Sequence, residues 1–228
     1  MRRWISVTTR AALLVVLTCC AASAMAQDPA KVAPDLYKVV LNNARVRVLE
    51  VKGTAGQKAA LHKHPGYVVY SIGGGSVRFV DAKGAVSEPT DMQPGSATWR
   101  DAETHGSQVV SDIHALLFEL KETGGPHFGK PEGADPVTAD PEHFKLLLDN
   151  AHVRVLEFTA PAGAKIPMHW HPDYVTYNFS GGRTTFTYPK GKPVVADAKA
   201  GDAAFHKAEN HAGLIGEGGA HVLLVEIK

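Results

Sequence analysis

The chain has 228 residues, of which 12 are histidine, and its formal net charge at pH 7 is +1. A near-neutral chain without a basic run argues against nucleic acid as a partner. Its two cysteines, Cys19 and Cys20, lie in a segment that we expect to be removed. Imidazole is then the obvious metal-binding group, so the excess of histidine is the feature to explain.

The first 26 residues have the pattern of a secretory signal. Arginines near the start precede an apolar run over 11–22, and Ala24, Met25 and Ala26 supply a small-residue cleavage site. The apolar run is shorter than the roughly 20 residues of a transmembrane helix. We therefore expect cleavage after Ala26, a periplasmic or secreted location, and no membrane insertion of the mature chain.

The two halves of the chain repeat each other at an offset of 107 residues. The segment LNNARVRVLEV over 41–51 recurs as LDNAHVRVLEF over 148–158. A repeat of this length indicates gene duplication. We predict an N-terminal domain over 34–121 and a C-terminal domain over 143–228, joined by a Gly/Pro-rich linker over 122–142.

Short strand patterns follow one another within each half. The segments 46–51, 67–72 and 114–121 are rich in β-branched or alternating apolar residues, and Gly-rich turn signals separate them. No segment has a sustained helical period. The sequence therefore predicts an all-β fold of two barrels or sandwiches.

Each half contains a His-x-His pair and a third histidine about 40 residues later. Residues i and i+2 of a strand point to the same face, so each pair converges on one side. Three imidazoles around one cation leave coordination positions for substrate and for oxygen or water. The six predicted metal ligands are His62, His64 and His105 in the first half and His169, His171 and His211 in the second.

These motifs resemble those of the cupin superfamily. The first cupin motif begins Gly-x5-His-x-His and is matched from Gly56 and from Gly163. The second begins with a glycine and ends near a third metal-binding histidine, and is matched from Gly95 and from Gly201. The resemblance covers nearly the whole chain after the signal. It implies a bicupin, with two tandem barrels of the double-stranded β-helix or jelly-roll type.

The chain departs from the cupin pattern at the glutamate of the first motif. Val68 and Val175 occupy that position and cannot bind metal, although counting from the His pair predicts that they point into the barrel. Cupins with a carboxylate ligand, such as oxalate decarboxylases, are therefore less similar in ligand set. Three-His cupins are more similar, and these include thiol, gentisate and diketone-cleaving dioxygenases.

The ligand set suggests a substrate class. Three neutral ligands leave a divalent metal its full charge, which favours an anionic, bidentate oxygen ligand. Tyr70 and Tyr177 share the predicted inward parity and are our candidate catalytic residues, as hydrogen-bond partners of substrate or oxygen. We predict an exported Fe(II)-dependent dioxygenase acting on a small oxygenated molecule, with Mn, Zn or Cu as alternative metals.

Two other functional classes stay open. One is a non-catalytic periplasmic protein that binds metal or a small ligand, and the other is a metal-assisted isomerase or lyase. A homo-oligomer is compatible with either class.

Several other repeated residues are expected to have structural roles. Arg47 and Arg154 lie between valines, which favours a solvated outer face of a strand. Tyr67 and Tyr174 have the opposite parity to the ligands and are predicted to pack outside the barrel. The histidines without a predicted ligand role are His114, His127, His143, His152, His206 and His221; for His206, a place in the second pocket and a surface position both stay open.

Overall fold

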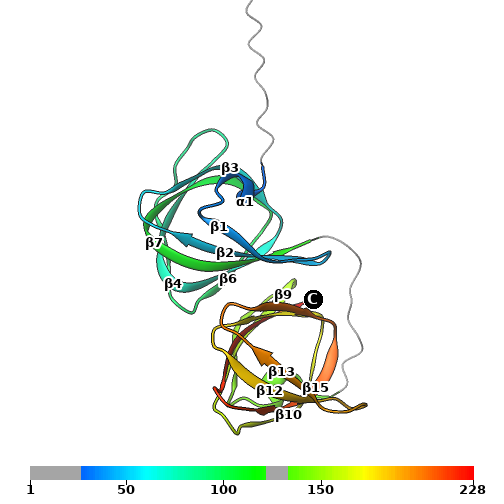
Figure 1. The fold of residues 1–228 in the computed structure, drawn as a ribbon. Coiled ribbons are helices and arrows are strands. Elements are labelled where there is room, and N and C mark those ends of the chain that lie inside the picture. Colours follow the sequence, from blue (N-terminus) through cyan, green and yellow to red (C-terminus); the bar gives the residue numbers. More distant parts are fainter. Residues whose placement is uncertain (1–26, 122–132) are drawn as a thin grey trace, which may run out of the picture.

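The computed structural model describes residues 27–121 and 133–228 (Figure 1). The predicted signal sequence, 1–26, and the first part of the predicted linker, 122–132, lie outside the described residues. The described elements are nearly all antiparallel strands, which confirms the predicted all-β fold.

The first half forms one antiparallel sheet that curls into a barrel. Its elements are α1 (Pro29–Val32), β1 (Tyr37–Asn42), β2 (Val46–Gly53), β3 (Lys58–His64), β4 (Tyr67–Val80), β5 (Thr90–Met92), β6 (Ala97–Arg100) and β7 (Glu103–Leu120). The strand order is β1-β2-β7-β4-β5, with β3 also paired to β7 and β6 to β4. The first part of β7 pairs with β3 and its last part pairs with β2. This one strand therefore runs through both layers of the barrel.

The second half repeats this arrangement with two separate sheets. Its elements are α2 (Pro136–Ala139), β8 (Phe144–Asp149), β9 (Val153–Ala160), β10 (Lys165–His171), β11 (Tyr174–Asn178), β12 (Gly182–Thr187), β13 (Val194–Ala198), β14 (Ala203–His206), β15 (Glu209–Ile215) and β16 (Ala220–Ile227). The orders are β10-β15-β12-β13 and β14-β11-β16-β9-β8. The counterpart of β7 is interrupted between β15 and β16. Gly218 and Gly219 have φ of 91° and 69° there, a conformation that favours glycine.

A short helix precedes each barrel. Asp28 caps α1 and Asp135 caps α2, each through its carboxylate, and a proline occupies the first helical turn. The Gly/Pro density that predicts a helix-free linker over 122–142 is therefore misleading for α2. The backbone N–H of Trp170 on β10 donates to Ala134 O at 3.0 Å, which ties this segment to the second barrel. In the part of the chain that the structure describes, neither helix has the length and apolarity that crossing a membrane requires.

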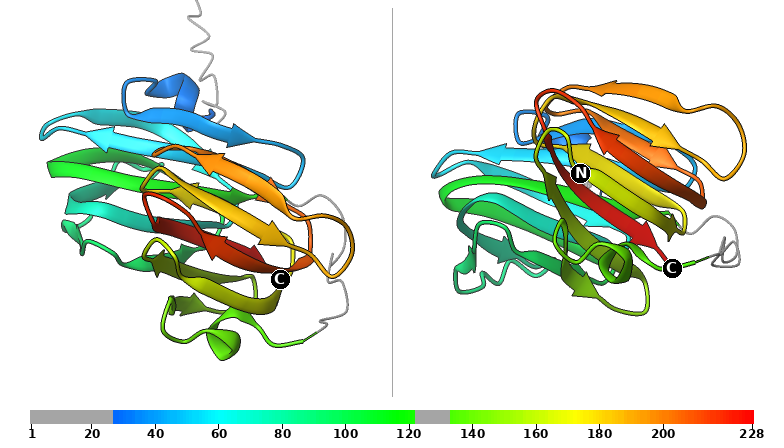
Figure 2. Two further views of the ribbon diagram at one scale, coloured as in Figure 1. Left: turned by 60° about the horizontal axis from the view of Figure 1, so that its bottom comes forward. Right: turned by 90° about the horizontal axis from the view of Figure 1, so that it is seen from below.

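An apolar core joins the two halves. Residues of β2, β4 and β7 pack against residues of β9, β11 and β16, and the facing sheets form adjacent layers (Figure 2). The end of β7 is buried on both faces: Leu117 points into the first barrel, whereas Leu116 and Phe118 point to the other half. Strands buried on both faces are near-continuously apolar, which is the pattern of this segment.

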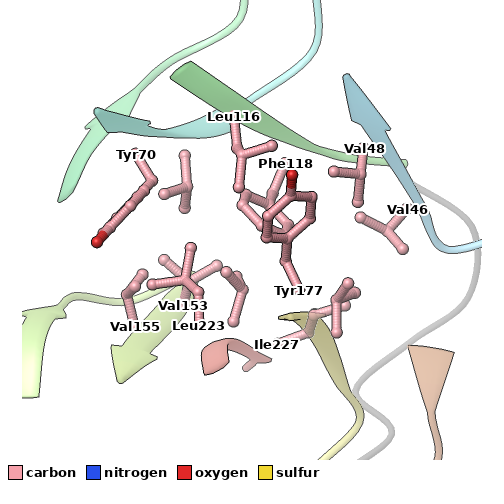
Figure 3. Close-up of a cluster of buried hydrophobic side chains, with 13 residues drawn as sticks. Val46, Val48, Tyr70, Leu116, Phe118, Val153, Val155, Tyr177, Leu223 and Ile227 are labelled. Atoms are coloured by element: carbon pink, nitrogen blue, oxygen red, sulfur yellow. The ribbon is translucent and has the colours of Figure 1, made fainter. Parts of the chain in front are cut away.

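The four residues that parity counting placed inside the barrels lie in this shared core. Val68, Tyr70, Val175 and Tyr177 all belong to the cluster between the halves, shown in Figure 3. The inward prediction is wrong because parity holds only within one continuous strand. Pro65-Gly66 separates β3 from β4, so the count from His64 does not carry over to β4.

Candidate metal centres

The first group of three histidines comes from two adjacent strands of the N-terminal barrel. β3 contributes His62 and His64, and β7 contributes His105, which pairs directly with His62 across the sheet. The three ring centroids lie 4.8–5.3 Å apart. One nitrogen from each ring lies within 4.8 Å of the other two, and all three residues are buried. The structure thus brings together the three predicted ligands.

The second group has the same construction. His169 and His171 lie on β10, and His211 on β15 pairs directly with His169. Their ring centroids lie 4.7–5.2 Å apart, and their nitrogens also lie within 4.8 Å of one another. We call the two groups the N-terminal centre and the C-terminal centre.

Backbone carbonyl groups orient the first histidine of each centre. The Nδ1 atom of His62 lies 2.7 Å from Ala60 O, and that of His169 lies 2.7 Å from Pro167 O. A carbonyl oxygen only accepts, so in both rings Nδ1–H donates and Nε2 carries the lone pair. Burial lowers the pKa of His62 and of His169 to about 4, so both rings are neutral at pH 7. Neutral imidazole is the metal-binding form.

Buried carboxylates orient the second histidine of each centre. The Nδ1 atom of His64 lies 2.6 Å from Glu119 Oε1, and that of His171 lies 2.7 Å from Glu226 Oε1. This is the arrangement of the outer carboxylates that fix ligand histidines in metalloproteins. Sequence reasoning missed these two glutamates, although they recur at the same offset of 107.

Carboxylates also lie beside the third histidine. Nδ1 of His105 is 3.3 Å from Glu103 Oε2, and Nδ1 of His211 is 3.2 Å from Glu209 Oε1. The contact at His211 has hydrogen-bond geometry, whereas the one at His105 is an electrostatic contact only.

Each outer glutamate belongs to a longer row of charges. Arg47 Nε donates to Glu119 Oε2, and Arg47 Nη1 donates to Asp28 at 2.6 Å. In the second half, Arg154 donates to Asp135 at 2.6 Å, but its Nη1 lies 3.7 Å from the outer glutamate. The expectation that these arginines face solvent is wrong, because their side chains are only 14% and 18% exposed.

The different arginine distances give the outer glutamates different pKa values. Burial opposes ionisation of Glu119, but hydrogen bonds from His64 and Arg47 outweigh it and lower its pKa. For Glu226, burial dominates over the more distant Arg154 and raises the pKa to about 7.

Two tyrosines that parity placed outside the barrels contact the centres. The ring of Tyr67 lies 4.7 Å from that of His64, and its hydroxyl donates to Glu103 at 2.6 Å. The ring of Tyr174 stacks on His171 at 4.5 Å, and its hydroxyl donates to Glu209 at 2.8 Å. These tyrosines take the place expected for Tyr70 and Tyr177, which line neither cavity.

Each centre opens on the interior of its barrel. The N-terminal cavity has a volume of about 140 Å³ and is lined in part by Tyr37, Arg100 and Ser107. The C-terminal cavity has a volume of about 280 Å³, and at the equivalent places it has Phe144, His206 and Gly213. His206 stacks on Tyr174 at 4.6 Å, so this histidine belongs to the second pocket.

The other histidines have structural partners. The Nε2 atoms of His114 and His221 lie 3.0 and 2.9 Å from carboxylate oxygens of Glu50 and Glu157. His152 stacks on Trp99 of the other half at 4.5 Å. His143 contacts the carboxylate of Asp140, and His127 lies outside the described residues.

The donor set fits a divalent metal. The Nε2 atoms of His64, His169 and His171 are buried and have no hydrogen-bond partner among the described residues. Leaving a buried acceptor unsatisfied costs about 1–3 kcal/mol, and a bound cation would remove that cost. Because Nδ1 of each ring is hydrogen-bonded to a carboxylate or carbonyl oxygen and Nε2 has no partner, these imidazoles are oriented as metal ligands.

Comparison with solved structures identifies the fold as that of cupins. Oxalate decarboxylase from Bacillus subtilis, a protein with Mn(II) centres, matches 81% of this chain and 69% of its own, with 17% identity and a TM-score of 0.58. A structure of the same enzyme at pH 4.6 matches 80% and 68%, with 17% identity and a TM-score of 0.56. A cupin 2 conserved barrel domain protein from Leptotrichia buccalis matches 85% and 88%, with 15% identity and a TM-score of 0.48.

Sequence comparisons find no relative. No protein-family model matches the chain, and no curated protein matches it. At the identities above, the structural likeness shows the fold alone. The molecule is therefore a cupin-fold protein with two groups of three histidines suited to a divalent metal.

Proposed function

We propose that this chain is a bicupin metalloenzyme that holds one divalent metal ion at each centre and oxidises a small oxygenated substrate with O₂. The observation that carries the proposal is that each centre gathers three buried histidine nitrogens within 4.8 Å of one another, and that the Nε2 atoms of His64, His169 and His171 have no hydrogen-bond partner among the described residues. Among the described residues, neither group of possible ligands contains a carboxylate, and the position of the cupin glutamate is Val68 or Val175 in the core between the halves.

A bound Fe(II) ion would supply a binding position for oxygen and would stabilise negative charge on the substrate. The chain supplies the rest. The barrel interior is largely apolar, and the neutral imidazoles leave the charge of the ion uncompensated, which favours an anionic substrate. Tyr67 and Tyr174 replace Tyr70 and Tyr177 as the proposed hydrogen-bonding residues, because they contact the ligand rings and line the cavities.

The tyrosine hydroxyls are suited to hold a proton beside the reacting groups. Burial and the neighbouring glutamates raise the pKa of Tyr67 and of Tyr174, so both phenols stay protonated at neutral pH. Each phenol donates a hydrogen bond to a carboxylate oxygen, which fixes the direction of its hydroxyl. A substrate oxygen entering the cavity would therefore meet a phenol and a carboxylate whose directions are already fixed.

Mn(II) is the second candidate metal, since the oxalate decarboxylase of the same fold has Mn(II) centres. The pattern of residues 1–26 supports export of the protein, so periplasmic metal supply would decide which ion is loaded.

The test is to purify the protein anaerobically, measure its metal content, and follow O₂ uptake with enolic and catecholic acids. We expect two ions per chain and metal-dependent O₂ uptake with at least one acid. CO₂ release from oxalate without O₂ consumption would favour a lyase instead. Stoichiometric metal without turnover of any of these acids would favour the non-catalytic binding protein.

A further inference from the structure

The residue that faces the first histidine of each centre differs between the halves. Tyr37 begins β1, and its counterpart at the offset of 107 is Phe144, at the start of β8. Tyr37 meets the His62 ring at a centroid distance of 5.4 Å and an angle of 64°. Phe144 meets the His169 ring at 5.2 Å and the same angle. The two aromatic rings are placed alike, so the phenolic oxygen is what differs.

That oxygen is directed at the Nε2 atom of His62. Tyr37 Oη lies 3.3 Å from Nε2 of His62, and both side chains are buried. This separation is long for a hydrogen bond between a hydroxyl and a ring nitrogen. Two donors that each lie about 2.1 Å from one ion, at angles of roughly 90–109°, are separated by roughly 3.0–3.4 Å. The observed distance meets the criteria for a weak hydrogen bond and also agrees with the separation of two ligands on a shared ion.

A second hydroxyl accompanies the phenol in the N-terminal centre only. Ser107 lines the same cavity and interacts with the Tyr37 phenol. Its counterpart at the offset of 106 is Gly213. The two hydroxyl groups are thus present together at one centre and absent together from the equivalent places at the other.

We propose that Tyr37 is a fourth protein ligand of the N-terminal centre, whereas Phe144 leaves the C-terminal centre with three. This inference rests on the proposed metal binding. On coordination the phenol loses its proton to solvent, and the oxygen binds the ion as phenolate. In zinc proteins, four protein donors characterise structural sites, and three donors with an open position characterise catalytic sites. Substrate chemistry accordingly belongs to the C-terminal centre, which also has the larger cavity.

Iron(III) provides a direct readout, because a phenolate bound to it gives a charge-transfer absorption in the visible range and imidazole does not. The full chain is loaded with Fe(III), and its iron content and visible spectrum are recorded. The same measurements are made on Tyr37→Phe, on Phe144→Tyr and on the double variant. Each substitution places in one half the residue that the other half already has, so both are compatible with the fold.

We expect the wild-type protein to show the band and Tyr37→Phe to lose it while its iron content stays the same. The Phe144→Tyr variant should show about twice the absorbance per chain, and the double variant should return to the wild-type value, with the band arising from the C-terminal centre. Iron binding with identical spectra for wild type and Tyr37→Phe would overturn this inference alone. Failure of every variant to bind iron, manganese or zinc would overturn the proposed metal binding as well.

Discussion

In the N-terminal centre, Glu103 accepts hydrogen bonds from Tyr67 and from the guanidinium of Arg100. In the C-terminal centre, Glu209 accepts one from Tyr174, and His206 stands where the arginine would be. The histidines and their outer glutamates are the same in both. The two halves therefore share the parts that orient the imidazoles and differ in several of the parts that face the cavity.

The two centres also differ in the charge of the groups that surround them. The guanidinium of Arg100 balances the carboxylate of Glu103 and stacks over the ring of Phe79 at 4.5 Å. At the other centre, the balancing groups of Glu209 are imidazoles, which carry charge only when protonated. The two cavities thus present different fields to an entering anion, and four experiments test how far the centres differ.

The largest effect is expected from removing a ligand. His169→Ala should reduce the metal content from two ions per chain to one, because two imidazoles without the third no longer form the site. His62→Ala should weaken the N-terminal centre less, because Tyr37 would remain there beside two imidazoles. Metal analysis after gel filtration measures this. If either substitution released both ions, metal binding at the two centres would be coupled, and the two centres could not be treated as independent sites.

Acid should destabilise the metal-free protein through both centres. The pKa values of His62 and His169 are about 4 in the folded chain and about 6.5 when unfolded. The unfolded chain therefore binds more protons between these values, and stability present above pH 6.5 is lost as the pH falls toward 4.

The expected loss is on the order of 2 kcal/mol for each histidine. Denaturant unfolding of the metal-free protein at pH 7 and pH 5 measures it, and His62→Ala or His169→Ala should each reduce the pH dependence. An unchanged slope in both variants would exclude these residues as its source.

Loss of an outer carboxylate should weaken metal binding without abolishing it. Glu119→Gln and Glu226→Gln keep the shape of the side chain but replace the carboxyl group by a neutral amide, and changes to the residues behind the ligands cost about 10–100-fold in affinity. We expect the larger loss for Glu119, whose charge Arg47 fixes more closely. Chelator competition measures the affinities, and Glu88→Gln, at an exposed position, serves as the control. Equal losses would show that the arginine distance is unimportant.

The smallest effect is expected at the outer end of each charge row. Asp28→Asn and Asp135→Asn remove the ion pair with an arginine but keep a good helix cap. Because both aspartates are about one-third exposed, each change should cost about 0.2–1 kcal/mol. Thermal unfolding measures this. A loss of several kcal/mol in one half only would reveal a stronger role for that helix.

The fold class and the ligand histidines could be predicted because both depend on local patterns. Alternation within β3 places His62 and His64 on one face, and the same holds in the repeat. The outer glutamates could not be predicted in this way, since Glu119 lies 55 residues from His64 and meets it only across the barrel. Their recurrence in both halves was the available signal.

The errors at the tyrosines have a different origin. The side-chain alternation of β3 was continued through Pro65-Gly66, where the chain turns and a new strand begins. The count therefore assigned Tyr70 to the barrel and Tyr67 to the outside, which is the reverse of what the structure has. An apolar outer face was also not expected, because a single barrel considered alone would present that face to water.

The apolar core between the halves has a consequence for how the two barrels depend on each other. Equivalent residues from each half, such as Tyr70 and Tyr177, meet in one cluster, as the same surface would in a two-fold symmetric dimer. A single barrel of this kind would need a second copy of itself to cover this face. With both halves in one chain, the pairing is independent of protein concentration. The two halves can also have different cavities, as Arg100 and His206 show, which the identical subunits of a symmetric homodimer cannot.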